Sequence, residues 1–435
     1  MAEYTCDICN ERFDEEEKSL TNDESKCILH CEKDDWYEHS VFKKDWTKSK
    51  KHINKFWNKI QENLNNIYDT STYEQAILND IKEYKSVIFP QFQQDIKFCT
   101  FKENGDEQGT NFYSYKIFDN QKTQQQKHPP YPELNTIFES LEIVFDNCIF
   151  LDTANFLKYK FTKSVSFQND CIFEKKCELP TQTNVLFENV TFKDNIEINN
   201  LKSINKVLYD NCSFLSSISF SEKTIEENLF KNCLFRGNIT ARNITFKGMM
   251  FNNSSDFLGY DKKYFNLQNI NLFECILKKP FYLNHLSNTS IYHKSFAIMS
   301  VNFFNSTFDD EFKIYNSQID AIYLNNTKFT KLCMINNMKI DEIVFDNSIF
   351  SDSLLFNDNS CESDVDFSST KLFGNSTLNN NRINGDLNLE NTFINGKVSF
   401  LHLKCSFKNR ETLRVIKDSY EQQNNIIEAN KYYSL

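Results

Sequence analysis

Glycine and proline are scarce in this chain, which has 8 glycines and 6 prolines among 435 residues. Folds built on tight hairpins take these two residues in their turns, so a fold of many such hairpins is not expected. Asparagine recurs instead between the apolar segments. Because asparagine tolerates a positive φ angle and can hydrogen-bond its own backbone, we expect it to turn the chain.

Long apolar runs are also missing. No window approaches the roughly 18 uninterrupted apolar residues of a membrane-spanning helix. The start, Met1–Asn10, lacks the basic residues followed by an apolar stretch that mark a secretory signal. Together with this start, the 14 cysteines indicate reduced thiols and a cytoplasmic location. The alternative location is the cytoplasmic face of a membrane.

Signatures of catalysis are few. His285, His293 and His402 are isolated, with no serine or aspartate pattern that would suggest a catalytic triad. The few glycines form no phosphate-binding loop. We therefore expect a protein that is not an enzyme and that has no catalytic residues.

The negative charge of the chain is concentrated at one end. Residues 1–40 carry 13 Asp and Glu against 4 Lys and Arg, a net charge of −9. Of the total of −11, only −2 therefore falls on residues 41–435. With 40% apolar and 25% charged residues the chain is expected to fold.

A six-residue phrase recurs along the chain: apolar, any, Asn, small, any, apolar. Its first residue falls at 324, 335, 345, 356, 367, 378, 389 and 400, and further upstream at 209, 230, 251 and 272. These spacings fit a square coil of four five-residue sides plus one or two extra residues. They match neither the period of an α-helix nor the alternation of a simple strand. Over positions 145 to 400 they predict about 12 coils. Clear copies begin at Phe145, Phe187, Tyr209 and Phe230.

Over residues 140–407 this pattern resembles the pentapeptide-repeat family, whose unit places a bulky apolar residue and a small residue two positions earlier inside the coil. The matching pairs are Cys148 before Phe150, Cys212 before Phe214, Ser306 before Phe308, Thr327 before Phe329 and Ser348 before Phe350. The resemblance implies an all-β solenoid, a right-handed quadrilateral β-helix. The phrase is interrupted at 255–264 and 278–290, where we expect loops or bent coils.

The flanking segments differ in pattern from the repeat. Residues 41–86 are predicted to be a helical linker, because Trp46, Ile53, Trp57, Ile60, Leu64 and Ile67 recur at spacings of 3, 4 and 7. Seven lysines against one aspartate between 43 and 59 form either a solvated face or a face for an acidic surface, which the acidic segment 1–40 could supply. Residues 87–139 are expected to be a partial coil, with Cys99 two before Phe101, and a polar loop at 119–133.

The C-terminal segment 408–435 is predicted to be a helix that caps the last coil. Asn409 is its expected N-cap and Glu411 lies in its first turn. Leu413, Ile416, Tyr420 and Ile427 mark its apolar face. We expect the part up to about Tyr420 to cover the coil, and the remainder to be free or bound to a partner.

The strongest chemical motif lies in residues 1–40, a predicted Cys-rich zinc-binding module. Cys6 and Cys9 form a Cys-x-x-Cys pair, and Cys27, His30 and Cys31 form a second close group further along the segment. Such close pairs of soft ligands suit tetrahedral Zn²⁺. Cys6, Cys9 and Cys27 are three of the expected ligands, and either His30 or Cys31 can be the fourth. The alternatives are unrelated cysteines and a redox Cys-x-x-Cys pair, although no βαβ pattern surrounds this one.

From these patterns we expect a scaffold that presents a rigid β-helical surface to a protein partner whose identity the sequence does not give; homo-oligomerisation stays open. An alternative follows from residues 410–433 and from the Cys27–Lys33 segment, which resemble parts of larger bacterial pentapeptide-repeat proteins. That resemblance implies the cytoplasmic sensor or regulatory part of a membrane-associated protein, which is either shortened here or has its membrane part elsewhere. Some family members mimic DNA, but mimicry needs a strongly negative rod, and the charge of −2 on residues 41–435 argues against it. No direct nucleic-acid binding is expected.

Overall fold

The computed structural model describes residues 3–39, 44–46, 49–69, 81–90, 142–155, 163–179, 183–221, 224–252, 268–284 and 298–432. The chain divides into two compact units, Met1–Asn205 and Lys206–Leu435. Several predictions fall outside the described residues: Cys99 with Phe101, the polar loop at 119–133, the break at 255–264, and both His285 and His293. Within the predicted break at 278–290, Phe281–Asn284 form strand β27.

The first unit begins with a small module made of short elements. Strands β1 (Tyr4–Thr5) and β2 (Arg12–Phe13) pair in antiparallel fashion, and helix α1 (Glu15–Thr21) follows. Asp14 caps α1 by accepting a hydrogen bond from the backbone N–H of Glu17, as an aspartate N-cap does. The elements after it are a 3-10 helix η1 (Asp34–Trp36) and the antiparallel pair β3 (Glu38–His39) and β4 (Lys44–Asp45).

Helix α2 (Lys50–Asp69) covers the first solenoid turn of this unit. Its buried face carries Ile53, Phe56 and Ile60, and the ring of Phe56 meets that of Phe89 edge-on at 5.7 Å. The prediction of a helix over 41–86 is thus confirmed for its middle part. The prediction is wrong at both ends of this range. Lys44–Asp45 form strand β4, and Ile81–Lys85 form strand β5, which pairs with β7 in a solenoid sheet.

The lysine face of α2 meets the acidic module within the same unit. Lys51 pairs with Glu16 at 3.5 Å, and Lys59 pairs with Glu11 at 3.4 Å. The acidic segment therefore neutralises part of the basic run, which was one of the two interpretations of the sequence. The Lys51–Glu16 pair is exposed, and such a pair contributes at most about 1 kcal/mol. Lys59 is largely buried, with 17% of its side chain exposed.

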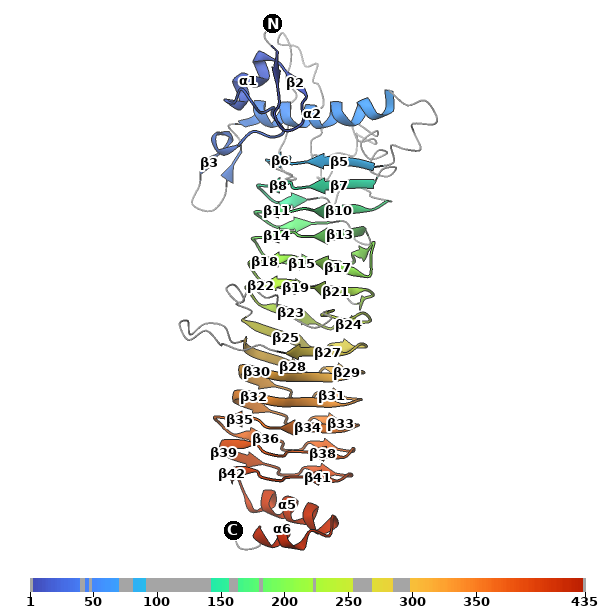
Figure 1. The fold of residues 1–435 in the computed structure, drawn as a ribbon, viewed down its shortest axis with the longest axis vertical. Helices are drawn as coiled ribbons and strands as arrows, with labels where there is room; N and C mark the ends of the chain where they lie inside the picture. Colours follow the sequence, from blue (N-terminus) through green and yellow to red (C-terminus); the bar gives the residue numbers. More distant parts are fainter. Residues whose placement is uncertain are drawn as a thin grey trace, which may run out of the picture. The chain divides into compact units, whose positions relative to one another are not determined.

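Below α2 in Figure 1, the first unit continues as parallel strands stacked turn upon turn. One sheet runs β5–β7–β10–β13, with β16 beside β13; a second runs β6–β8–β11–β14; and β9 pairs with β12. The bounds are β5 (Ile81–Lys85), β6 (Ile88–Phe89), β7 (Glu142–Asp146), β8 (Ile149–Phe150), β9 (Ala154–Asn155), β10 (Val165–Gln168), β11 (Ile172–Phe173), β12 (Cys177–Glu178), β13 (Asn184–Glu188), β14 (Thr191–Phe192), β15 (Ile196–Ile198) and β16 (Lys202–Ser203).

The second unit is built in the same way and ends in two helices. Its strands are β17 (Val207–Asp210), β18 (Ser213–Phe214), β19 (Ile218–Phe220), β20 (Thr224–Ile225), β21 (Asn228–Lys231), β22 (Leu234–Phe235), β23 (Ile239–Arg242), β24 (Thr245–Phe246), β25 (Asn269–Phe273), β26 (Ile276–Leu277), β27 (Phe281–Asn284), β28 (Ile298–Phe304), β29 (Thr307–Phe308), β30 (Phe312–Tyr323), β31 (Lys328–Phe329), β32 (Cys333–Val344), β33 (Ile349–Phe350), β34 (Leu354–Asn357), β35 (Ser360–Cys361), β36 (Val365–Asp366), β37 (Lys371–Leu372), β38 (Ser376–Thr377), β39 (Arg382–Asn388), β40 (Phe393–Ile394), β41 (Val398–Ser399) and β42 (Lys404–Phe407). The parallel pairing of each strand with its counterpart one turn away makes this unit, too, a β-solenoid.

Within the described residues the solenoid has about 10 turns, close to the 12 or so expected. The pairing of Ile322 with Ile343 shows a turn of the expected length. Two successive turns are longer, because Ile239 pairs with Ile270 and Ile270 with Val301. The extra residues lengthen these two turns without adding another one.

Stacked phenylalanine rings form the interior of both units. In the first unit Phe150 stacks on Phe89 at 4.9 Å and on Phe173 at 4.5 Å. In the second, Phe329 and Phe350 stack at 4.9 Å with their planes 7° apart. These rings are buried, as the repeat predicted. Each ring shields the next from water, which no single turn could do alone.

The recurring asparagine turns the backbone. The φ angle lies between 53° and 58°, in the left-handed region, at Asn147, Asn189, Asn326 and Asn347. Most of the other non-glycine residues with a positive φ angle are asparagines too. The small residue that follows each asparagine points inward, and its side chain can donate a hydrogen bond to a backbone carbonyl of the preceding turn. For example, the Cys148 thiol donates to the carbonyl of Tyr84 at 3.1 Å, one turn away.

Helices α5 (Arg410–Gln422) and α6 (Ile426–Lys431) close the end of the second unit, below the last strands in Figure 1. Asn409 caps α5 as predicted, accepting from the backbone N–H of Thr412. Ile416 and Tyr420 are buried, as predicted, and Leu413 is half-buried. Ile427 is 78% exposed, so its predicted place on the apolar face is wrong. The second half is not free either, because α6 folds back and Tyr432 stacks on Tyr420 at 5.9 Å.

Candidate metal centre

The turn between β1 and β2 presents the first two cysteines. The backbone N–H of Cys6 donates to the carbonyl of Glu11 at 2.9 Å, and the N–H of Asn10 donates back to the carbonyl of Cys6 at 2.8 Å. Asn10 takes a φ of 59°, which its side chain tolerates. This tight turn brings the Cys6 and Cys9 side chains to one side of the hairpin.

A second turn, beginning at Cys27, presents the other two residues. The N–H groups of His30 and Cys31 both donate to the carbonyl of Cys27, at 3.0 Å each. The turn is held from α1 by Glu17, whose buried carboxylate accepts from the N–H of Ile28 at 2.8 Å. Burial raises the pKa of Glu17, and the hydrogen bond from Ile28 acts in the opposite direction.

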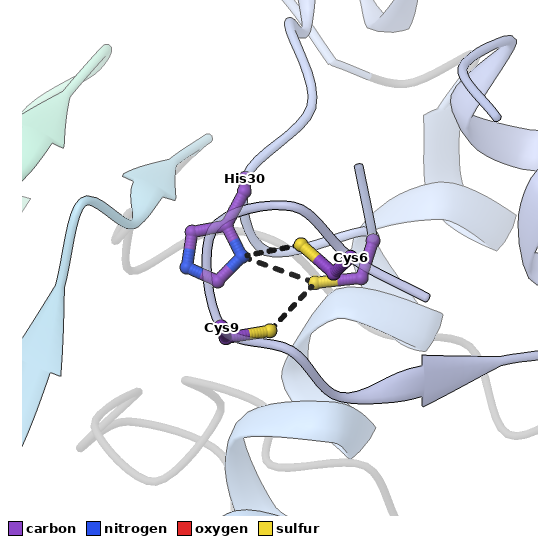
Figure 2. A group of neighbouring side chains, drawn as sticks. Cys6, Cys9 and His30 are labelled. Carbon is purple, nitrogen blue, oxygen red and sulfur yellow. Dashed lines mark hydrogen bonds between the residues drawn. The ribbon is translucent and has the colours of Figure 1, made fainter. Parts of the chain in front are cut away.

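The two turns bring four candidate ligands together. One ligand atom from each of Cys6, Cys9, Cys27 and His30 lies within 4.8 Å of all the others. In Figure 2 the His30 ring lies beside the sulfur atoms, with one ring nitrogen facing them. This nitrogen, Nδ1, is 3.1 Å from Cys27 Sγ and 3.5 Å from Cys6 Sγ. The sulfurs of Cys9 and Cys27 are 3.8 Å apart. Tetrahedral zinc with Zn–S bonds of about 2.3 Å needs sulfurs about 3.8 Å apart, so this set fits the metal.

The histidine is already oriented as a ligand. Its Nε2 lies 3.0 Å from the carbonyl of Lys85 in β5, so Nε2–H donates there and Nδ1 keeps a lone pair toward the sulfurs. Metal-bound histidines usually have such a partner, which fixes the ring and its tautomer. This contact ties the candidate centre to the first strand of the solenoid, a link that no sequence pattern indicated.

Cys31 is not part of the cluster. Its thiol points toward the carbonyl of Ile28, 3.7 Å away, and lies 3.7 Å from Lys33 Nζ. Spacing alone allowed either His30 or Cys31 as the fourth ligand. The turn at Cys27 decides between them by placing the His30 ring on the side of the hairpin.

The cluster favours a thiolate even before a metal binds. The hydrogen bond from the Cys27 thiol lowers the pKa of Cys9 to about 3, although burial acts against it. The same hydrogen bond, together with burial, raises the pKa of Cys27. Thiolate is the form of cysteine that coordinates metals. Because four protein ligands fill a tetrahedral shell, such a centre has no open position for a substrate.

The cysteines of the repeat serve a different purpose. In the described part of the chain one group has metal-ligand geometry, and it contains none of them. Burial raises the pKa of Cys275 to about 11 and that of Cys361 to about 12, so these thiols are poor nucleophiles. The predicted inward position is confirmed for Cys148 and Cys212, which are buried. Further cysteines of the repeat are buried as well (Cys171, Cys233, Cys275 and Cys333), while Cys405 is half-buried.

Neither a family model nor a curated protein nor a solved structure matches the chain.

Proposed function

We propose that the chain is a non-enzymatic scaffold that binds a protein partner through an outer wall of its solenoid. A structural Zn²⁺ would hold its N-terminal module in place. The observation that carries the proposal is a pair of exposed aromatic rings on the second unit. Phe373 and Phe393 are 41% and 51% exposed, and their ring centroids lie 5.8 Å apart.

The two rings belong to one regular surface. Phe393 is the register partner of Lys371 in the neighbouring strand, and Lys371 is the partner of Ile349 in the strand before. The wall thus presents an apolar pair framed by lysine on rigid parallel strands. Aromatic side chains contribute most of the binding free energy in many protein interfaces. A preformed surface also avoids the entropy loss of ordering a loop on binding.

The cluster of Cys6, Cys9, Cys27 and His30 supports zinc as its metal. Three sulfurs and one imidazole nitrogen suit Zn²⁺, whereas Ca²⁺ and Mg²⁺ prefer oxygen ligands. The module is short and acidic, and a metal would supply folding free energy that its small core does not. A structural role follows because the four ligands leave no site for chemistry.

The finer description of the fold is also part of the proposal: a right-handed quadrilateral β-helix of the pentapeptide-repeat type. Buried residues of one turn support it. They come in pairs five positions apart, at 333 and 335, 338 and 340, 343 and 345, and 348 and 350. This is the spacing of four sides with two inward residues each.

Affinity capture with matched surface variants tests the scaffold function. We expect the full chain to retain a partner from native lysate in a fixed ratio, and the Phe373→Ser/Phe393→Ser variant to lose it. Phe304→Ser is the control, because Phe304 is 43% exposed but lies on another sheet of the same unit. Equal capture by the double variant, with unchanged melting temperatures, would contradict the proposed surface.

A second candidate is the sensor part of a membrane-associated protein. Two neighbouring isoleucines of α6 favour it, since Ile426 is 53% and Ile427 is 78% exposed. No helix among the described residues is long and apolar enough to cross a membrane. The capture experiment separates the two candidates: this one predicts a partner from the membrane fraction, retained by the full chain and lost on Ile426→Ser/Ile427→Ser substitution.

A further inference from the structure

A lysine is buried beside the candidate metal centre. The side chain of Lys33 is among the largest fully buried ones, with 1% exposure. Its Nζ donates to the carbonyl of Cys31 at 2.8 Å and points toward the carbonyl of Leu29 at 3.5 Å. The ammonium also lies over two aromatic rings, 4.8 Å from the centroid of Trp36 and 5.4 Å from that of Phe56.

These contacts solvate the ammonium without neutralising it. None of the ion pairs in the described part of the chain includes Lys33. A buried charge without an opposite charge is strongly unfavourable. Burial lowers the pKa of Lys33 to about 8, while the nearby thiols of Cys31 and Cys27 act in the opposite direction.

The proposed zinc centre has the missing negative charge. Zn²⁺ with three thiolates and one neutral imidazole has a net charge of −1. The segment from Cys27 to Lys33 carries two of the four ligands and the lysine, so the charges lie close in sequence and in the same buried environment. Opposite charges attract more strongly where water is excluded.

We propose that Lys33 is the counter-charge of the metal–thiolate centre and stabilises its Cys₃His form. The inference rests on the proposed zinc centre and adds a positioning residue outside the ligand set. In this arrangement the ammonium offsets the charge of −1 that metal binding creates, and the paired centre is neutral. Lys33 makes no contact with the metal itself.

Zinc affinity measured against a chromophoric chelator tests the inference on the full chain. The variant Lys33→Met keeps the length of the side chain and removes the charge. We expect it to bind Zn²⁺ about 10 to 100 times more weakly, the usual effect of losing a partner outside the ligand set. In a Cys9→His background the centre would be neutral, so there the same change should leave the affinity unaltered or increase it.

Cobalt spectra supply the second readout. Co²⁺ bound to Lys33→Met should still show thiolate charge-transfer bands, which demonstrates that the ligand set has formed. An equal loss of affinity in both backgrounds would overturn the counter-charge role, because a packing defect does not depend on the charge of the centre. Unchanged affinity in Lys33→Met would overturn it as well. Absence of zinc binding by the unsubstituted protein would instead overturn the metal centre itself.

Discussion

At the scale of single residues, the interior depends on face-to-face stacking of identical side chains. Phe350 is fully buried and stacks on Phe329, and its ring also meets that of Phe345 at 5.9 Å. Parallel strands in register repeat this contact from turn to turn, since Phe329 and Phe350 are direct register partners. A ring removed from the stack leaves a gap that its neighbours on rigid strands are poorly placed to fill.

We therefore expect Phe350→Ala to lower the free energy of unfolding by about 3–5 kcal/mol, the cost of a large core cavity. Chemical denaturation followed by circular dichroism measures it. Phe393→Ala is the matched control on the same sheet: with its ring 51% exposed, it should change stability by about 0.5 kcal/mol or less. A similar loss in both variants would mean that the inward face is misassigned.

Hydrogen bonds explain why the small inward residue is so often cysteine, serine or threonine. The hydroxyl of Ser306 donates to the carbonyl of Leu272 at 3.1 Å, and that of Thr370 donates to the carbonyl of Phe345 at 3.0 Å. An alanine would fill the same space without this bond. The sequence pattern indicated only that a small side chain fits there, because the partner carbonyl belongs to another turn.

At the scale of elements, the last turn of the second unit is covered by hydrogen bonds as well as by apolar packing. Ser419 and Gln423 both donate to the carbonyl of Val398, at 2.8 and 2.6 Å. Tyr420 covers Phe400, with ring centroids 6.5 Å apart. Carbonyl groups at an open strand edge would otherwise be available to pair with another chain.

Deleting residues 409–435 should expose this edge, and we expect the shortened protein to associate end to end. Size-exclusion chromatography with light scattering would show oligomers that grow with concentration. The control is Arg414→Ala, on the exposed side of α5, which should have the same oligomeric state as the unsubstituted protein. A monodisperse monomer after the deletion would show that the helices are not needed as a cap. In the intact chain, rapid protease cleavage before Leu413 would count against the cap too.

How far the sequence predicts each element depends on how local its cause is. The N-cap at Asn409 and the left-handed asparagines are set by neighbouring residues, and both predictions are confirmed. The covering role of α2 was missed, because it arises from Phe56 meeting Phe89, which lies well beyond the end of the helix in the sequence. Similarly, motif spacing indicated three of the four clustered ligands, but the choice of His30 depends on the geometry of the turn at Cys27, which spacing does not describe.

At the scale of the whole molecule, stability is shared between neighbouring turns. Strands pair with strands one turn away, so a change at one end is felt most strongly by the turns beside it. The candidate metal centre is joined to the first turn in two places. These are the contact of His30 with Lys85, and the bond from the N–H of Ile88 to the carbonyl of Leu29, at 2.9 Å.

Removal of the metal by a chelator, or the substitution Cys6→Ser, should therefore loosen the N-terminal module and the first turns. Hydrogen exchange followed by mass spectrometry should show faster exchange over β1, β2, β5 and β6. The sheets around β30 and β32 in the second unit should exchange as before. Uniformly faster exchange along the chain would contradict nearest-neighbour coupling. No change near β5 would contradict a structural role for the metal.

The stacking of each strand on the strand one turn earlier also has a consequence for how the protein emerges from the ribosome. In the second unit, Val301 pairs with Ile322 and Ile322 with Ile343, so every newly made turn finds its partner in the turn made just before it. At synthesis rates of about 5–20 residues per second, one turn is completed in roughly 1–4 seconds. Each finished turn is then a ready template for the next, and assembly can proceed in the order of translation, with α5 and α6 following β42.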